Sequence, residues 1–148
     1  MDDRDKAEHR VEMLLYELFT NAPIAAGIRD VVDRDIIHVL DNPRSAALFG
    51  KTPSEMHGVT DSGLGVPREQ IDRAIARFRT ARASGHPMSA EISVEPPKGP
   101  RALSGTVAAP ADDRAERRLL VTQYPIEPRP LHAARPRAAP PTTLGTLR

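Results

Sequence analysis

The chain has 148 residues, the length of a single domain of ordinary size. It carries 21 Lys and Arg against 20 Asp and Glu, and its lack of Cys excludes disulfide scaffolds, thiolate metal sites and Cys nucleophiles. The charge is unevenly spread, because residues 128–148 contain four Arg and no acidic residue.

The composition divides the chain into three zones. Residues 1–9 are a charged lead-in, residues 10–126 carry alternating apolar patterns and turn signals, and residues 127–148 are rich in Pro and Arg. The last zone has too little apolar surface to offset its chain entropy, so it is predicted to be a disordered tail. The charged start is unlike a signal peptide, and no apolar run approaches the ~20 residues that span a bilayer. We therefore expect a cytoplasmic protein that does not enter a membrane.

The first predicted element is an amphipathic helix at the start of the middle zone. Its apolar residues follow the i, i+3, i+4, i+7, i+8 spacing of one helix face. They are Val11, Leu14, Leu15, Leu18 and Phe19. Such a stripe can cover the chain's own sheet or form a seam with a second copy of the chain, and the sequence leaves both roles open.

Two strands are predicted next, over residues 24–32 and 36–40, joined by a turn-prone Asp-Arg-Asp. Strict alternation puts Ile36, His38 and Leu40 on one face of the second strand. His38 is therefore the histidine that can face a cavity. We expect it to be a hydrogen-bonded core histidine, and haem ligation is the alternative.

Three helices follow, each with clear boundary signals. Asn42 can cap the first, with Pro43 at its first position. Thr52 can cap the second, with Glu55 completing a capping box. The third is a longer helix over residues 67–84, whose apolar residues also recur at helical spacing.

Beyond the long helix the apolar period changes from 3.6 to 2. This change predicts three strands, over residues 88–94, 102–108 and 119–123. An order of helix, two strands, several helices and three strands is typical of an α+β fold, in which an antiparallel sheet carries helices on one face.

Residues 42–50 (NPRSAALFG) and 52–58 (TPSEMHG) resemble the most specific motif of the PAS sensory domains. The order of elements over residues 14–123 agrees with that family. The resemblance implies a PAS-like fold, with a five-stranded antiparallel sheet, helices on one face and a preceding amphipathic helix. It also implies a cavity between sheet and helices, which in this family holds a small ligand, haem, flavin or nothing. Members of the family commonly dimerise through the helix that precedes the core.

The chain departs from several branches of this family. The flavin photochemistry of the light-sensing branch needs a Cys, and the chain has none. The best-known haem branch places a His on the long helix, and no His lies between Val66 and Gly85, so that ligation cannot form. The five His are scattered without metal-ligand spacing, and no metal site is expected. The identity of any other cofactor is left open.

The matching helices and strands supply a set of candidates for the ligand cavity. They are Ile28, His38, Leu48, Phe49, Met56, Ile75, Ile92 and Val107. An enzyme would need convergent polar groups in this cavity, and only His38 qualifies among these candidates. The sequence also lacks a G-x-S-x-G elbow, a P-loop and a G-x-G-x-x-G motif, so we expect no catalytic residues and no enzymatic activity.

These observations predict a sensory or regulatory module of bacterial signalling. We expect it to act as a homodimer, or to dock on a signalling protein such as a histidine kinase, with a small ligand biasing the docking. The alternatives are a ligand-free assembly domain and a remnant of a longer sensor kinase. Nucleic-acid binding is not expected, because the basic tail has four Arg and no aromatic stacking platform.

Overall fold

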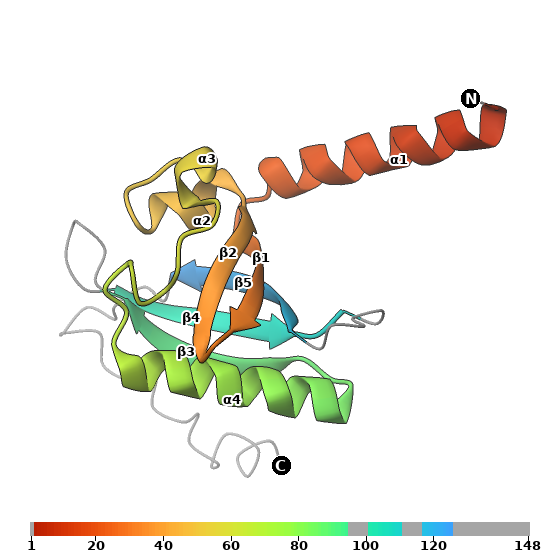
Figure 1. Cartoon of the computed structure of the whole chain (residues 1–148). Coiled ribbons are helices and arrows are strands. Elements are labelled where there is room, and N and C mark those ends of the chain that lie inside the picture. The colour runs from red at the N-terminus through yellow and green to blue at the C-terminus, as the bar shows by residue number, and fades with distance from the viewer. Residues whose placement is uncertain (1, 95–100, 111–116, 126–148) are drawn as a thin grey trace, which may run out of the picture.

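The structure is a computed structural model that describes residues 2–94, 101–110 and 117–125. Its centre is a single antiparallel sheet with the strand order β2-β1-β5-β4-β3 (Figure 1). The strands are β1 (Ala25–Val32), β2 (Asp35–Asp41), β3 (Met88–Val94), β4 (Arg101–Ala108) and β5 (Arg118–Pro125). The predicted α+β class and the five-stranded antiparallel sheet are confirmed. The predicted disordered tail lies outside the described residues.

Three helices pack on the sheet, and their starts agree with the sequence signals. They are α2 (Pro43–Ala47), α3 (Pro53–Met56) and α4 (Arg68–Ser84). The Asn42 side chain accepts the N–H of Ser45 at 2.9 Å. At α3, Thr52 and Glu55 form both hydrogen bonds of the predicted capping box. Helix α4 ends at Gly85, which adopts the left-handed conformation that glycine tolerates.

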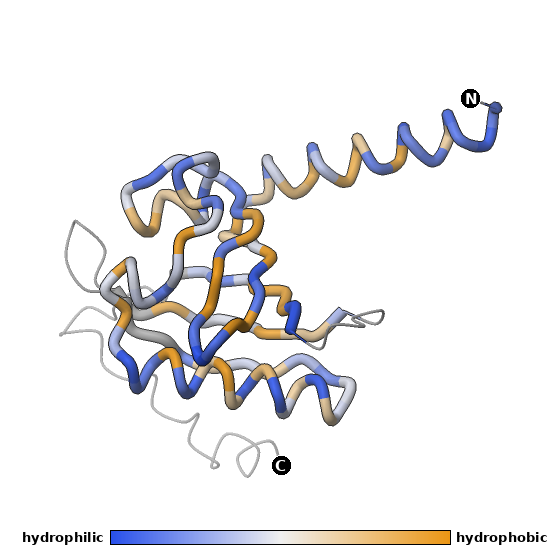
Figure 2. The backbone as a smooth tube through the Cα atoms, in the orientation of Figure 1, coloured by the Kyte–Doolittle hydropathy of each residue, from blue (hydrophilic) through white to orange (hydrophobic). Residues whose placement is uncertain are grey.

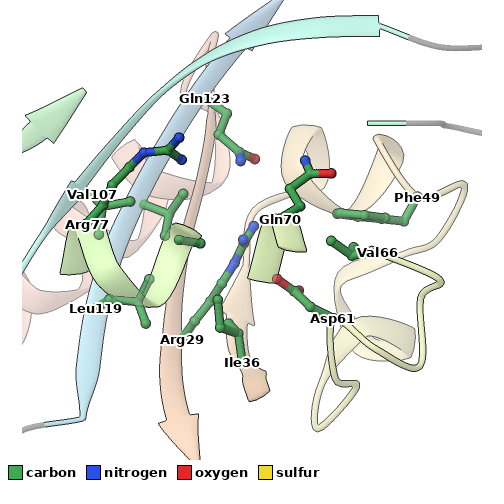
Figure 3. Close-up of a pocket in the computed structure, with 12 residues that line it drawn as sticks. Arg29, Ile36, Phe49, Asp61, Val66, Gln70, Arg77, Val107, Leu119 and Gln123 are labelled. Carbon is green, nitrogen blue, oxygen red and sulfur yellow. The ribbon is translucent and has the colours of Figure 1, made fainter. Parts of the chain in front are cut away.

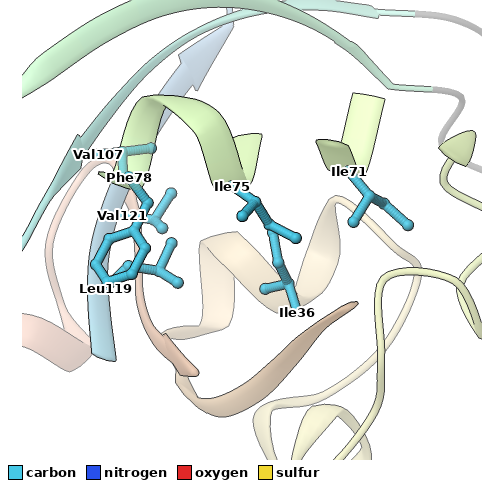
Figure 4. Packing of buried hydrophobic residues seen from close by; sticks show 7 residues of the cluster. All are labelled: Ile36, Ile71, Ile75, Phe78, Val107, Leu119 and Val121. Atoms are coloured by element: carbon cyan, nitrogen blue, oxygen red, sulfur yellow. The ribbon is translucent and has the colours of Figure 1, made fainter. Parts of the chain in front are cut away.

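The hydrophobic core lies between α4 and the sheet (Figure 4). Helix α4 contributes Ile71, Ile75 and Phe78, which are almost fully buried at the i, i+4, i+7 spacing. The sheet contributes residues from three strands, Ile36, Val107, Leu119 and Val121. Apolar side chains from α4 and three strands therefore pack against one another between helix and sheet.

Helix α1 (Asp3–Thr20) projects away from the rest of the chain (Figure 1). Asp2 caps it by accepting the N–H of Asp5 at 2.8 Å, so the charged lead-in predicted for residues 1–9 is helical from Asp3 onward. None of the residues in α1 is buried. Four of the five predicted stripe residues are 54–69% exposed, whereas Phe19 is half-buried beside the core. The alternative in which the stripe covers the chain's own sheet is therefore wrong.

Candidate functional site

A buried polar cluster lies on the side of the sheet that the helices cover. His38 on β2 is 0% exposed, and both of its ring nitrogens meet carboxylates. Nδ1 lies 2.8 Å from Oδ2 of Asp41, and Nε2 lies 2.7 Å from Oδ1 of Asp61. This arrangement confirms that His38 is a hydrogen-bonded core histidine.

The surroundings of Asp41 favour its ionised form. Burial raises the pKa of Asp41, but hydrogen bonds from His38 and Ser45 and the charge of Arg29 outweigh it, so the pKa is lowered overall. Ser45 Oγ donates to Oδ1 of Asp41 at 2.5 Å. Because an ionised carboxylate can only accept, the N–H at Nδ1 of His38 donates the hydrogen bond to Oδ2 of Asp41.

A β-bulge in β2 brings Asp41 to the same face as His38. Ile28 pairs with Leu40, but the next residue of β1, Arg29, pairs with His38, so Val39 is the extra residue. The bulge reverses the alternation beyond His38. Strict alternation predicted Leu40 beside His38, and the structure corrects this, because Asp41 takes that place and Leu40 is half-buried.

Two neighbouring residues hold the bulge in place. The carbonyl of Val39 accepts a hydrogen bond from Nδ1 of His57 at 2.8 Å, so the bulged backbone is not left without a partner. Gly27 lies directly opposite Asp41 on β1. A Cβ at Gly27 would stand only 3.1 Å from Oδ1 of Asp41 and 3.2 Å from the carbonyl of Leu40. The missing side chain thus lets Asp41 lie against β1.

Arg29 brings a buried positive charge to the cluster. Its side chain is 7% exposed, and Nη2 lies 3.9 Å from Oδ1 of Asp41, within ion-pair range but beyond a hydrogen bond. Within the described part of the chain, neither Nε nor Nη2 of Arg29 has a hydrogen-bond partner. Buried polar atoms in native proteins are nearly always hydrogen-bonded, so this guanidinium is unusual.

A small cavity of about 40 Å³ lies beside Arg29, between the sheet and α4 (Figure 3). Its apolar wall includes Ile36, Phe49, Val107 and Leu119. Its polar wall consists of Arg29, Asp61, Gln70, Arg77 and Gln123. The prediction that only His38 could offer a polar group to this cavity is wrong, because strand alternation and α4 turn several charged and amide side chains inward.

The structure distributes the predicted cavity residues unevenly. Phe49 and Val107 line the cavity, whereas His38, Met56 and Ile75 are buried without lining it. Two further predicted residues, Ile28 and Leu48, are half-buried. The side chain of Ile92 lies outside the described residues. Ile28 points to the face of the sheet opposite Arg29, because neighbouring residues of a strand alternate.

Sequence reasoning missed the polar lining for two different reasons. Arg29 shares its strand face with Ala25 and Gly27, and this alternation was a usable signal that its side chain points inward. Asp61 lies in a loop 23 residues from His38, and no local pattern links the two. Among the residues that the structure describes, no group of three His, Cys, Asp or Glu could hold a metal ion.

Comparisons of the sequence find no matching family model and no matching curated protein. Comparisons of the structure find many similar folds. One is the PAS domain, in complex with ethanol, of a LuxR-family transcriptional regulator from Burkholderia thailandensis. Its TM-score is 0.57 at 17% identity, over 75% of this chain and 96% of that chain. A PAS domain from Colwellia psychrerythraea gives a TM-score of 0.62 at 12% identity, over 78% and 97% of the two chains.

A third similar structure is the VqmA dimer of Vibrio cholerae, a LuxR-type receptor. Its TM-score is 0.61 at 19% identity, and the match covers 78% of this chain and 51% of that one. The chain thus spans about half the length of that receptor. At these identities the similarity concerns the fold.

None of the helices that the structure describes is long and apolar enough to cross a membrane.

Proposed function

We propose that this chain, which has the PAS fold, is a sensory or regulatory module of signal transduction. It works as a homodimer or docks on a signalling protein such as a histidine kinase, and it has no catalytic activity of its own. A small ligand in the cavity shifts the docking equilibrium by binding one state more tightly. The observation that carries the proposal is the exposed apolar stripe of α1.

The stripe of α1 needs a partner surface. Most of the stability of a helix in a protein comes from packing of its apolar face, and no side chain of α1 is fully buried. Leu14, Leu15 and Leu18 are more than half exposed. Figure 2 shows hydrophobic and hydrophilic residues alternating along the projecting α1. Two copies of the stripe can bury each other in a symmetric seam, because the same residues face each other in such a pair.

The face of the sheet that α2–α4 leave open exposes two large apolar side chains, Leu120 and Tyr124. Leu120 is 38% exposed there, and it pairs across the strands with the half-buried Ile28. Tyr124, farther along β5, is 52% exposed. An amphipathic helix from a second copy or from a signalling partner would cover this face. We propose that docking uses α1 and this open face together.

The polar cluster supports a binding role better than a catalytic one. A general acid or base must reach the proton that it transfers. His38 is fully buried, both ring nitrogens are engaged by carboxylates, and it does not line the cavity. The cluster therefore orders the interior of the fold and positions Arg29 and Asp61 at the cavity.

Substitution of Leu15 by Asp tests the dimer. Light scattering on the wild-type chain should give twice the monomer mass of 16.2 kDa, whereas Leu15→Asp should give 16.2 kDa, because a charge in the seam cannot be desolvated. Glu12→Lys, a charge change on the polar side of α1, is the matched control and should stay dimeric. A Leu15→Asp protein that is folded and dimeric would contradict the proposed seam.

A ligand-free assembly domain is the second candidate, and the size of the cavity favours it. A volume of about 40 Å³ is far below the ~300 Å³ of the smallest drug-sized pockets. Side chains of the core fill most of the remaining space. A chain that dimerises through α1 and responds to no small molecule would perform this second function.

A further inference from the structure

We infer that the cavity is a binding site for a small monocarboxylate, held by the guanidinium of Arg29. This inference rests on the proposed sensory function and names the chemical class of its ligand. Three observations carry it: two buried guanidinium nitrogens of Arg29 without hydrogen-bond acceptors, the size of the cavity and the charges of its lining.

The geometry of Arg29 points to a carboxylate. Nε and Nη2 form one edge of a guanidinium, with parallel donors that match the two oxygens of a carboxylate. The same chain shows this arrangement on the sheet, where Nε and Nη2 of Arg118 donate to the two oxygens of Asp30 at 3.0 and 3.3 Å. In Arg29 these same two atoms have no hydrogen-bond partner among the described residues.

Asp41 neutralises Arg29 only in part. Its Oδ1 is 3.9 Å from Nη2 of Arg29, too far for a hydrogen bond. Both carboxylate oxygens of Asp41 already accept hydrogen bonds, Oδ1 from Ser45 and Oδ2 from His38. Asp41 is therefore oriented toward these two residues, and Arg29 retains donors for a further acceptor.

The cavity sets the size of that acceptor. Arg29 lines it, and its guanidinium points toward the amide ends of Gln70 and Gln123 (Figure 3). The cavity's volume of about 40 Å³ is far below the ~300 Å³ of a drug-sized pocket, so only a small acceptor fits beside Arg29. Formate and acetate, with three and four non-hydrogen atoms, are the carboxylates of this size.

The charges of the lining favour a single negative charge. Two cationic side chains, Arg29 and Arg77, line the cavity together with one carboxylate, Asp61. Asp61 is already hydrogen-bonded to His38. The lining thus holds more cationic than anionic side chains, which favours an anion beside Arg29, and apolar side chains such as Ile36 and Val107 would lie against its methyl group.

A thermal-shift titration of the full chain with sodium acetate and sodium formate tests the site. A ligand that binds only the folded state raises Tm in proportion to ln(1 + [L]/Kd). We expect Tm to rise with acetate and formate in a saturable way. Acetamide has the size of acetate without its charge, and it should give no rise, nor should sodium chloride at equal ionic strength.

Arg29→Met removes the anchor and keeps the length of the side chain, and it should abolish the acetate response. Arg73→Met, the same change at an exposed position of α4, is the matched control and should retain the response. If Arg29→Met does not fold, line broadening of ¹³C-labelled acetate by the wild-type chain, reversed by excess formate but not by acetamide, supplies the answer.

Equal responses to acetate and acetamide, or an acetate response that survives in Arg29→Met, would overturn the carboxylate site. The binding measurement does not depend on the oligomeric state of the chain. The ligand proposal and the proposed function can therefore be refuted independently. A dimer that ignores acetate refutes only the ligand. A chain that binds acetate through Arg29 but stays monomeric and captures no signalling partner refutes only the signalling role.

Discussion

At the scale of residues, the structure depends on a chain of buried polar side chains that join three segments. Asp61 from a loop and Asp41 from β2 hold His38 between them, and Arg29 lies beside Asp41. Polar groups in a low-dielectric interior are stabilising only when each is satisfied. The cluster is therefore sensitive to the loss of a single member, and Asp41, which contacts three of its neighbours, is the most sensitive.

Asp41→Asn should destabilise the fold by about 3 kcal/mol at pH 7, because it leaves Arg29 without its countercharge in the interior. The wild-type contribution of Asp41 depends on pH. Because the pKa of Asp41 is lowered in the folded state, this contribution is complete above the unfolded pKa of about 3.9 and is lost as pH falls through the lowered value. The gap between wild type and variant should therefore narrow below about pH 4.

Urea denaturation at pH 7 and at several pH values down to 3 measures that gap. Asp33→Asn is the control, since Asp33 is exposed in the turn between β1 and β2 and Asn tolerates its positive φ of 50°. The control should change stability by less than about 0.5 kcal/mol. A gap between wild type and Asp41→Asn that is independent of pH would show that the charge of Asp41 is not what stabilises the cluster.

At the scale of elements, Asn42 is the connection between α1 and the core. Its Nδ2 donates to the carbonyls of Phe19 and Ile24 at 3.1 and 2.9 Å. Its Oδ1 accepts the N–H groups of Ala26 and Ser45 at 3.0 and 2.9 Å. One side chain thus ties the end of α1, the start of β1 and the first turn of α2 together, and this explains why it is almost completely buried.

Asn42→Ala should lower the free energy of unfolding by about 2–4 kcal/mol, because four hydrogen bonds are lost and buried backbone groups lose their partners. Asn42→Asp keeps the acceptor for Ala26 and Ser45 but cannot donate to Phe19 and Ile24. It should therefore retain the cap of α2 and loosen the junction with α1. Chemical denaturation measures the first effect, and amide hydrogen exchange along α1 measures the second.

Thr52→Ala serves as the comparison for the loss of a cap alone, since Thr52 caps α3 at an exposed position. It should cost about 1 kcal/mol. If Asn42→Ala costs no more than Thr52→Ala, Asn42 acts only as a helix cap and does not connect α1 to the core.

At the scale of the whole molecule, two surfaces of the described part of the chain expose large apolar side chains. One is the stripe of α1, and the other is the face of the sheet around Leu120 and Tyr124. A contiguous exposed apolar surface marks an interaction site in a folded protein. Under the proposed function, a second molecule would dock on these surfaces.

Association through α1 should make thermal stability depend on protein concentration. If only the dimer is folded, each tenfold increase in protein concentration raises the apparent free energy of unfolding by about 1.4 kcal/mol, and Tm should rise by a few degrees. Leu15→Asp should remove this dependence. Differential scanning calorimetry between micromolar and millimolar concentrations makes the measurement, and a wild-type Tm that does not change with concentration would contradict a dimer linked to folding.

The sequence by itself determined the elements and their local boundaries. Periodicity identified the longer helices and the strands, and cap signals at Asn42 and Thr52, within three positions of the residues they cap, identified the two short helices. The apolar stripe of α1 was also visible in the local sequence. The helix itself begins earlier than predicted, at Asp3, because Asp2 caps it.

Only the tertiary structure decided the contents of the interior. Because of the bulge at Val39, Asp41 and not Leu40 lies on the same face of the sheet as His38. This depends on how β2 pairs with β1, so the sequence of β2 alone does not show it. Asp61 contacts His38 because its loop folds back onto β2. Arg29 lines the cavity because α4 packs over the sheet and supplies the opposite wall. Local patterns report which face of an element is buried, whereas the chemistry of the site arises from contacts between residues far apart in the chain, and these exist only once the fold has formed.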